Sequence, residues 1–132
     1  MKRLTVYLAC MWCVIQFVFS QNRNNHYENY IETLLKNKGF VVKRTPKSGD
    51  QGVDLIVEGN NNRIAIQCKF YSKPVGNKAV QEISAGKDYY NCALGCVVSN
   101  NTFTPSARKL ANSLEITLLN NSAIIDYVSV NS

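Results

Sequence analysis

The 132-residue chain is predicted to form one α/β domain in which helices flank a central mixed β-sheet. Its segments alternate between β-like runs and stretches of helical periodicity, and they begin in the order α-β-β-β-α-β. Apolar residues make up 45% of the chain and charged residues 18%, an ordinary globular composition that excludes a disordered or collagen-like chain. One hydrophobic N-terminal helix is expected in addition to this domain.

The N-terminal segment, residues 1–20, is expected to be separate from the domain at residues 21–132. After two basic residues, positions 4–19 are almost entirely apolar. This run is slightly long for the core of a signal peptide and slightly short for a transmembrane helix. A signal peptide or membrane anchor would make the protein exported or membrane-anchored. A later start at Met11, or packing of the segment on the domain, would favour a cytoplasmic protein instead.

The remaining elements follow from periodicity and turn-forming residues. Apolar residues at spacings of three and four predict a helix at 24–38, which Gly39 ends. Glycine- and asparagine-rich turns separate the next three runs, which predicts an antiparallel meander. The expected strands are 40–44, 53–57, 63–71, 92–99 and 116–119, and the later helices are 77–90, 104–113 and 122–128.

Three polar residues in the predicted meander are expected to lie together. Asp54 is flanked by apolar neighbours, and a carboxylate there is costly to bury unless it is paired or binds a metal. In the following strand, the two-residue period places Gln67 and Lys69 on one face, with Cα atoms about 7 Å apart. The short turn at 59–62 pairs the two strands and brings Asp54 alongside these residues.

This grouping predicts phosphodiester hydrolysis. A carboxylate and an amide oxygen are suitable ligands for Mg²⁺, for which Mn²⁺ is expected to substitute. A neighbouring lysine can orient an attacking water molecule and offset phosphate charge. The chemistry that these residue types offer is therefore that of a metal-dependent nuclease.

At this point the sequence resembles a known family. The motifs that carry the resemblance occur in order: SGDQGVDLI at 48–56, IQCK at 66–69 and AVQEI at 79–83. Together they resemble the catalytic domain of Mrr-type (type IV) restriction endonucleases, within the PD-(D/E)xK nuclease superfamily. The resemblance extends from Tyr27 to the end of the chain.

The resemblance implies a restriction-endonuclease-like core and a Mg²⁺-dependent DNA endonuclease. It makes Asp54 the metal-binding acid, Lys69 the catalytic lysine and Glu28 a residue that assists the metal site. Gln67 stands where the superfamily usually has Asp or Glu, which removes one negative charge and is expected to weaken metal affinity. Gln81 matches a residue on the next helix that approaches the scissile phosphate.

Structural explanations exist for several acidic residues. With Asn25 as the N-cap, Glu28 resembles the second residue of a capping box. Glu82 is expected to be a solvent-facing partner for Lys78, four residues before it. Asp50 is interpreted as a turn residue.

The formal net charge of +6 favours an anionic partner, and DNA is the expected one. Basic residues around the proposed site are candidate phosphate contacts, although an ordinary solvated surface would explain any one of them. They are Lys43, Arg44, Lys47, Lys73 and Lys78.

The sequence is also compatible with other partners and with a second function class. Residues 4–19 are the candidate membrane contact, and a homodimer is the expected route to double-strand cleavage because one active site cuts one strand. The alternative function is a catalytically silent DNA-binding or membrane-tethered module on the same fold. The five cysteines indicate no disulfide framework, and the pair Cys10 and Cys13 has no second pair with which to hold a metal.

Overall fold

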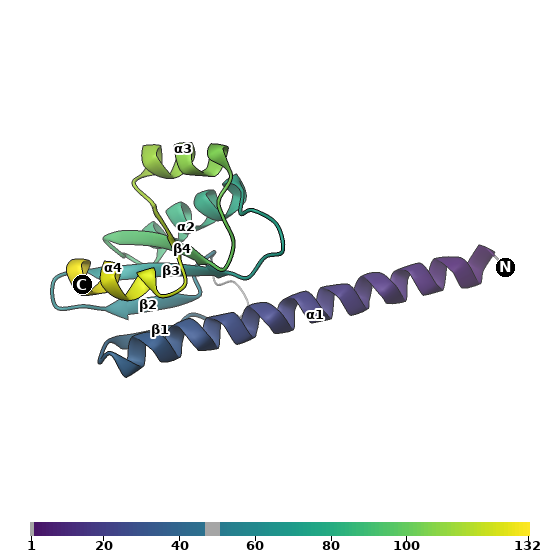
Figure 1. Cartoon of the computed structure of the whole chain (residues 1–132), viewed down its shortest axis with the longest axis horizontal. Coiled ribbons are helices and arrows are strands. Elements are labelled where there is room, and N and C mark those ends of the chain that lie inside the picture. Colours follow the sequence, from purple (N-terminus) through teal and green to yellow (C-terminus); the bar gives the residue numbers. More distant parts are fainter. Residues whose placement is uncertain (1, 47–50) are drawn as a thin grey trace.

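The computed structural model describes residues 2–46 and 51–132. The order of elements in this part of the chain confirms the predicted α/β class (Figure 1). The helices are α1 (Lys2–Asn37), α2 (Asn77–Tyr89), α3 (Pro105–Leu114) and α4 (Ala123–Asn131). The strands are β1 (Val41–Arg44), β2 (Leu55–Glu58), β3 (Arg63–Lys69), β4 (Leu94–Ser99) and β5 (Thr117–Asn120).

The five strands form one mixed sheet in the order β1-β2-β3-β4-β5. Strands β1, β2 and β3 are antiparallel, as the meander prediction required, and Leu55 pairs with Ile66. Strands β4 and β5 run parallel to β3. Parallel neighbours need a crossover connection, which α2 and α3 provide.

Helices cover both faces of the sheet. On one face, α1 and α4 bury apolar side chains that include Ile31, Leu35 and Ile124. On the other face, α2 and α3 do the same with residues such as Ile83 and Ala107. Because side chains alternate along β3, one set of its residues faces α1 and the other faces α2.

The first helix is longer than the sequence predicted. One continuous helix, α1, replaces the separate segments expected at 1–20 and 24–38. The polar residues between these segments include no Gly or Pro and lie on an exposed part of the helix, so nothing there ends it. Asn25 therefore lies inside a helix, and the capping-box explanation of Glu28 is wrong.

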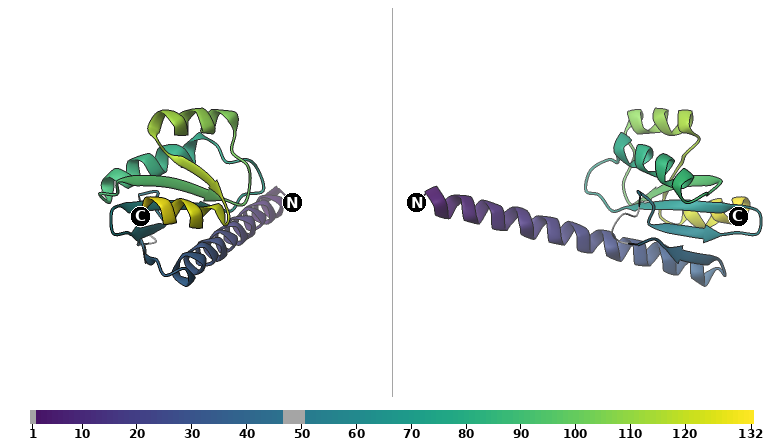
Figure 2. Two further views of the ribbon diagram at one scale, coloured as in Figure 1. Left: turned by 60° about the vertical axis from the view of Figure 1, so that its left-hand side comes forward. Right: turned by 180° about the vertical axis from the view of Figure 1, so that it is seen from behind.

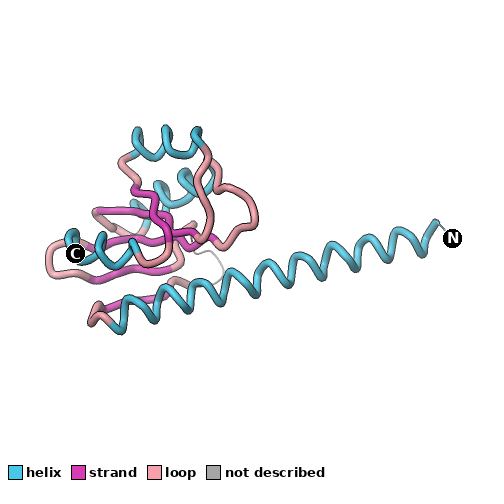
Figure 3. Tube along the Cα trace, in the orientation of Figure 1, coloured by secondary structure: helices cyan, strands magenta, loops and turns pink. Residues whose placement is uncertain are grey.

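The N-terminal half of α1 extends beyond the rest of the molecule (Figure 2). Residues 3–23 are exposed, so the alternative in which this segment packs on the domain is wrong. An 18-residue window has a mean hydropathy of 1.6 and no buried share, so by length and composition the helix could cross a membrane. A signal sequence meets the same criterion. The tube drawing shows the same helix as an unbroken rod (Figure 3).

Candidate functional site

A cavity of about 310 Å³ lies where β2 begins and β3 ends, between α1 and α2. It brings together four of the five predicted site residues, namely Glu28, Asp54, Gln67 and Lys69. The fifth, Gln81, is an exposed residue of α2 and does not line this cavity. Its neighbour Glu82 lines the cavity instead.

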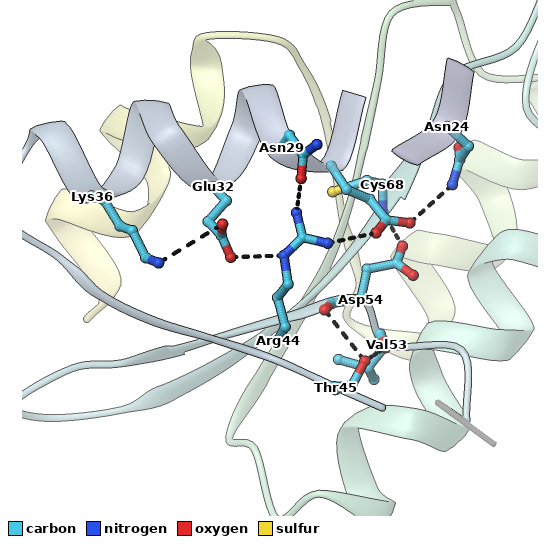
Figure 4. A network of polar contacts seen from close by, with 10 residues as sticks. Asn24, Asn29, Glu32, Lys36, Arg44, Thr45, Val53, Asp54 and Cys68 are labelled. Atoms are coloured by element: carbon cyan, nitrogen blue, oxygen red, sulfur yellow. Dashed lines mark hydrogen bonds and ion pairs between the residues drawn. The ribbon is translucent and has the colours of Figure 1, made fainter. Parts of the chain in front are cut away.

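Asp54 lies immediately before β2 rather than within it, and its backbone is held on both sides. Its N–H donates to the carbonyl of Ile66 at 2.9 Å, which continues the pairing with β3 by one residue. Its carbonyl accepts a hydrogen bond from the N–H of Thr45 at 3.2 Å. Its Oδ2 accepts from the backbone N–H of Cys68 at 2.8 Å (Figure 4). The carboxylate is thus fixed in orientation at the edge of the cavity.

Close packing against α2 also fixes the approach to Asp54. Gly52, two residues earlier, has φ +78°. A Cβ atom at this position would lie 2.8 Å from the backbone oxygen of Glu82. Only glycine fits both the conformation and the contact without strain.

Gln67 is a buried polar residue, with 2% of its surface exposed. Its Nε2 donates to Glu82 Oε2 at 2.8 Å. Its Oε1 is buried and has no hydrogen-bond partner among the described residues. An orphaned buried oxygen is costly, and a cation would satisfy it.

The donors at this cavity fit a hard cation. Asp54, Gln67 and Glu28 offer carboxylate and amide oxygens, which Mg²⁺ and Mn²⁺ prefer. Within residues 2–46 and 51–132, no three Asp, Glu, His or Cys residues cluster closely enough to hold a metal ion. A metal here would therefore depend on the amide oxygen of Gln67 as well as on carboxylates.

Glu82 connects the two β3 residues of the site. Its Oε2 lies 3.7 Å from Lys69 Nζ as well as against Gln67, and its Oε1 lies 3.8 Å from Lys78 Nζ. The predicted partnership with Lys78 is confirmed, but the expectation that Glu82 faces only solvent is wrong. The sequence signal for this contact is that Glu82 is adjacent to Ile83, an apolar residue expected to face the sheet. Helix α2 packs on the sheet face that carries Gln67 and Lys69.

Glu28 reaches the cavity from α1. Its side chain is 13% exposed and accepts a hydrogen bond from Asn24 Nδ2 at 3.1 Å. On its other side, Arg44 NH1 lies 3.4 Å from Glu28 Oε2. Arg44 also donates to Glu32 at 2.9 Å and to Asn29, so α1 and β1 are joined by this guanidinium (Figure 4).

Comparison with known families identifies the chain. A family model described as a restriction endonuclease, Mrr_cat, matches residues 20–128. The chain belongs to this Mrr-type restriction endonuclease family. The predicted recognition is therefore confirmed, and the family is one of nucleases.

Two solved structures, with TM-scores above 0.5, agree with the fold of this Mrr-type domain. A protein of unknown function, AF1548, is 25% identical with a TM-score of 0.57, covering 71% of this chain and 57% of its own. The MspJI restriction endonuclease, in complex with a 27-mer oligonucleotide, is 14% identical with a TM-score of 0.51, covering 89% of this chain and 30% of its own. A repair endonuclease from Pyrococcus abyssi is 16% identical with a TM-score of 0.49, covering 74% of this chain and 45% of its own. The chain thus spans less than two thirds of each of these proteins, and no curated protein matches it.

The predicted phosphate contacts of the Mrr-type domain have different surroundings. Arg44 is directed to the carboxylates of α1, so its guanidinium is already engaged inside the molecule. Lys43 lies 3.6 Å from Glu58, away from the cavity lining, and Lys78 pairs with Glu82 at the cavity rim. Lys73 is exposed in the loop after β3. Lys47, like Asp50, lies outside the described residues.

The five cysteines of the chain are all free. Cys10 and Cys13 are exposed on α1, whereas Cys68, Cys92 and Cys96 are buried. Burial raises the pKa of the Cys68 thiol well above its usual value, and the nearby charges of Asp54 and Glu28 raise it further. Burial likewise raises the pKa of Cys96. The buried thiols are therefore protonated and unreactive in the folded protein.

Proposed function

We propose that this Mrr-type domain is a metal-dependent DNA endonuclease that hydrolyses phosphodiester bonds at the cavity between α1 and α2. One observation carries the proposal. Asp54, Gln67 and Lys69 converge on that cavity, and the buried Oε1 of Gln67 has no partner among the described residues. An oxygen left unsatisfied at a site lined by carboxylates supports cation binding there.

The residues divide the chemistry between them. Asp54, Gln67 and Glu28 would hold Mg²⁺ or Mn²⁺, and such a cation supplies Lewis-acid polarisation of a phosphate oxygen. The Lys69 ammonium, on the same cavity wall, offsets phosphate charge and orients the attacking water.

Glu82 acts as a positioning residue. By accepting a hydrogen bond from Gln67 Nε2, it turns Oε1 of the same amide in another direction. By lying 3.7 Å from Lys69 Nζ, it restrains the lysine head group. Glu82 also provides a negative charge at the site, where Gln67 is neutral and replaces the usual acidic residue.

The test uses the full chain in mild detergent with supercoiled plasmid and Mg²⁺ or Mn²⁺. Wild-type protein is expected to give nicked product that EDTA abolishes, and Lys69→Met is expected to cut at least about a hundredfold more slowly, as for loss of a catalytic charge. The matched control is Lys109→Met, because Lys109 is an exposed lysine of α3 outside the cavity lining. Linear product at higher protein concentration would support cleavage by two copies.

Binding of the plasmid without cutting in either metal would contradict the proposal. It would favour the silent DNA-binding module instead. Equal cutting by the wild type and Lys69→Met would show that another site, or a contaminant, is responsible. Circular dichroism of both lysine variants establishes that folding is unchanged.

We also propose that α1 anchors the protein in a membrane, so that the domain is exported or membrane-bound. The support is the exposed apolar run, with a mean hydropathy of 1.6 over 18 residues and no buried share. Cys10 and Cys13 provide the test, since they are the exposed thiols of the chain. In lipid vesicles they are expected to be protected from a water-soluble maleimide, and rapid labelling there would contradict insertion.

A further inference from the structure

A second cavity, of about 1150 Å³, lies between α1 and the loop that follows β3. In Figures 1 and 2 this loop projects on the same side as the N-terminal half of α1. Six of the side chains at this junction are aromatic or basic, and we refer to these six as the collar. They are Phe17, Phe19 and Arg23 of α1 and Phe70, Tyr71 and Lys73 of the loop.

The collar exposes large aromatic side chains. Phe17 and Phe19 are 64% and 58% exposed, and Phe70 and Tyr71 are 37% and 39% exposed. Such a concentration of exposed aromatic surface marks an interaction site rather than ordinary solvated surface. Arg23 and Lys73 add two exposed positive charges at the same place.

The position of the collar along α1 indicates the partner. Residues 4–19 span about 24 Å at 1.5 Å per residue, most of the roughly 30 Å of a bilayer's hydrocarbon core. The collar begins at the end of this run, so an inserted α1 places it at the level of the lipid head groups. Aromatic and basic side chains are the residues that favour that level, and basic ones favour anionic lipids.

We propose that the collar rests on the surface of an anionic bilayer, with the loop after β3 as a second membrane contact besides α1. This inference rests on the proposed membrane anchor and not on nuclease activity. The competing partner is DNA, to which Lys73 could contribute a phosphate contact. Continuity with the apolar run favours lipid, because DNA offers no reason for exposed Phe17 and Phe19 beside the charges.

The contact would fix where the nuclease site lies. Asn24 and Glu28 line the candidate site and follow Phe19 by five and nine residues in one unbroken helix, or about 8 and 14 Å. Lys69 directly precedes Phe70 of the collar. The site is therefore held within a few turns of the membrane surface. Taken together with the separately proposed nuclease function, this position makes DNA that reaches that surface the substrate class.

The test compares two exposed serines as thiol reporters in the full chain. Ser72→Cys places a thiol in the collar loop, and Ser106→Cys places one on α3 as the matched control. Both are made in a Cys10→Ala, Cys13→Ala background, in which the remaining native cysteines are buried. Each protein is reconstituted in vesicles of phosphatidylcholine with or without phosphatidylglycerol and treated with an uncharged, water-soluble maleimide.

In vesicles that contain phosphatidylglycerol, the thiol at position 72 is expected to label several-fold more slowly than the one at position 106. Adding Lys73→Glu is expected to remove most of that protection, since each basic residue near an anionic surface contributes about fivefold in affinity. Equal labelling at the two positions in anionic vesicles would overturn the proposal. So would protection of position 72 that appears only when duplex DNA is added.

The native cysteines separate this result from failure of the anchor. If Cys10 and Cys13 of the unmodified chain are protected in vesicles while the thiol at position 72 is not, α1 inserts and the collar proposal alone is wrong. If Cys10 and Cys13 label freely, the anchor fails, and the collar proposal fails with it. Neither outcome depends on plasmid cleavage, so the nuclease proposal is tested independently.

Discussion

Replacing Gly86 with alanine tests whether α2 packs as closely against the approach to Asp54 as the structure shows. Gly86 lies inside α2, where helix propensity alone predicts that Gly86→Ala stabilises the protein by about 1 kcal/mol. In the folded protein the new Cβ would overlap the carbonyl oxygen of Gln51 and would lie 2.6 Å from Cγ2 of Val53. One of these neighbours is backbone, so relief requires the chain itself to move.

The gain in helix propensity and the cost of the steric contact have opposite signs. The cost of the contact is expected to be the larger of the two. Overpacking a filled interior costs about 1–3 kcal/mol, and a contact this short with backbone falls in the upper part of that range. After the helix gain is subtracted, the expected net loss in the free energy of unfolding is about 1–2 kcal/mol. For a domain of this size, at about 4 °C per kcal/mol, that corresponds to a fall in Tm of roughly 4–8 °C.

The assay is thermal unfolding of the full chain in mild detergent, followed by circular dichroism. Gly76→Ala is the control for an added methyl group without a clash, because no heavy atom lies within 4 Å of its new Cβ. Gly76 is the N-cap of α2, so this control carries no gain in helix propensity. Plasmid nicking is measured as well, since displacement of Gln51 to Val53 shifts Asp54 and should slow cutting beyond any loss of folded protein. An unchanged or raised Tm for Gly86→Ala would refute the close packing of α2 on this segment.

Three further predictions concern charge. Gln67→Glu places a buried carboxylate against Glu82 and is expected to lower the free energy of unfolding by roughly 1–3 kcal/mol. Adding Glu82→Gln should restore that free energy, and urea denaturation measures both variants. Full stability of the single variant would contradict the contact. Arg44→Met removes a cation shared by two partly exposed carboxylates of α1, so a loss of about 1 kcal/mol in the free energy of unfolding is expected in the same urea assay. An unchanged or larger free energy of unfolding would argue against the pairing. Burial raises the pKa of Cys68 and Cys96 above the ordinary 9.0, so these thiols ionise at lower pH in the unfolded chain than in the folded protein. The free energy of unfolding therefore falls as the pH rises above about 9. Each thiol contributes a slope of about 1.4 kcal/mol per pH unit; Cys96→Ala should reduce the slope, and an unchanged slope would exclude this cause.

Local patterns were sufficient to predict the β-meander and three residues of its site. Asp54, Gln67 and Lys69 come together because a strand has a two-residue period and a short turn sets the pairing of adjacent strands. The structure keeps that relation, with Asp54 paired one residue beyond Leu55 and Ile66. Such information lies within about fifteen consecutive residues and does not depend on the rest of the fold.

The first helix shows where local patterns failed. The change in hydropathy at the polar stretch after residue 20 predicts a boundary there. Hydropathy reports the surroundings of a helix, not its continuity, and a helix ends only where backbone or capping residues end it. The structure has one helix from Lys2 to Asn37.

The sequence by itself determined the α/β order, the Mrr-type motifs and the chemistry available at Asp54, Gln67 and Lys69. Only the tertiary structure decided that Glu82, not Gln81, lines the site and that Arg44 is held by α1. The reason is physical. Neighbouring residues on a helix point about 100° apart, and which of them faces the sheet depends on side chains packed from distant segments. Ion-pair partners likewise depend on which segments lie side by side in the folded protein, and local sequence patterns do not predict that arrangement.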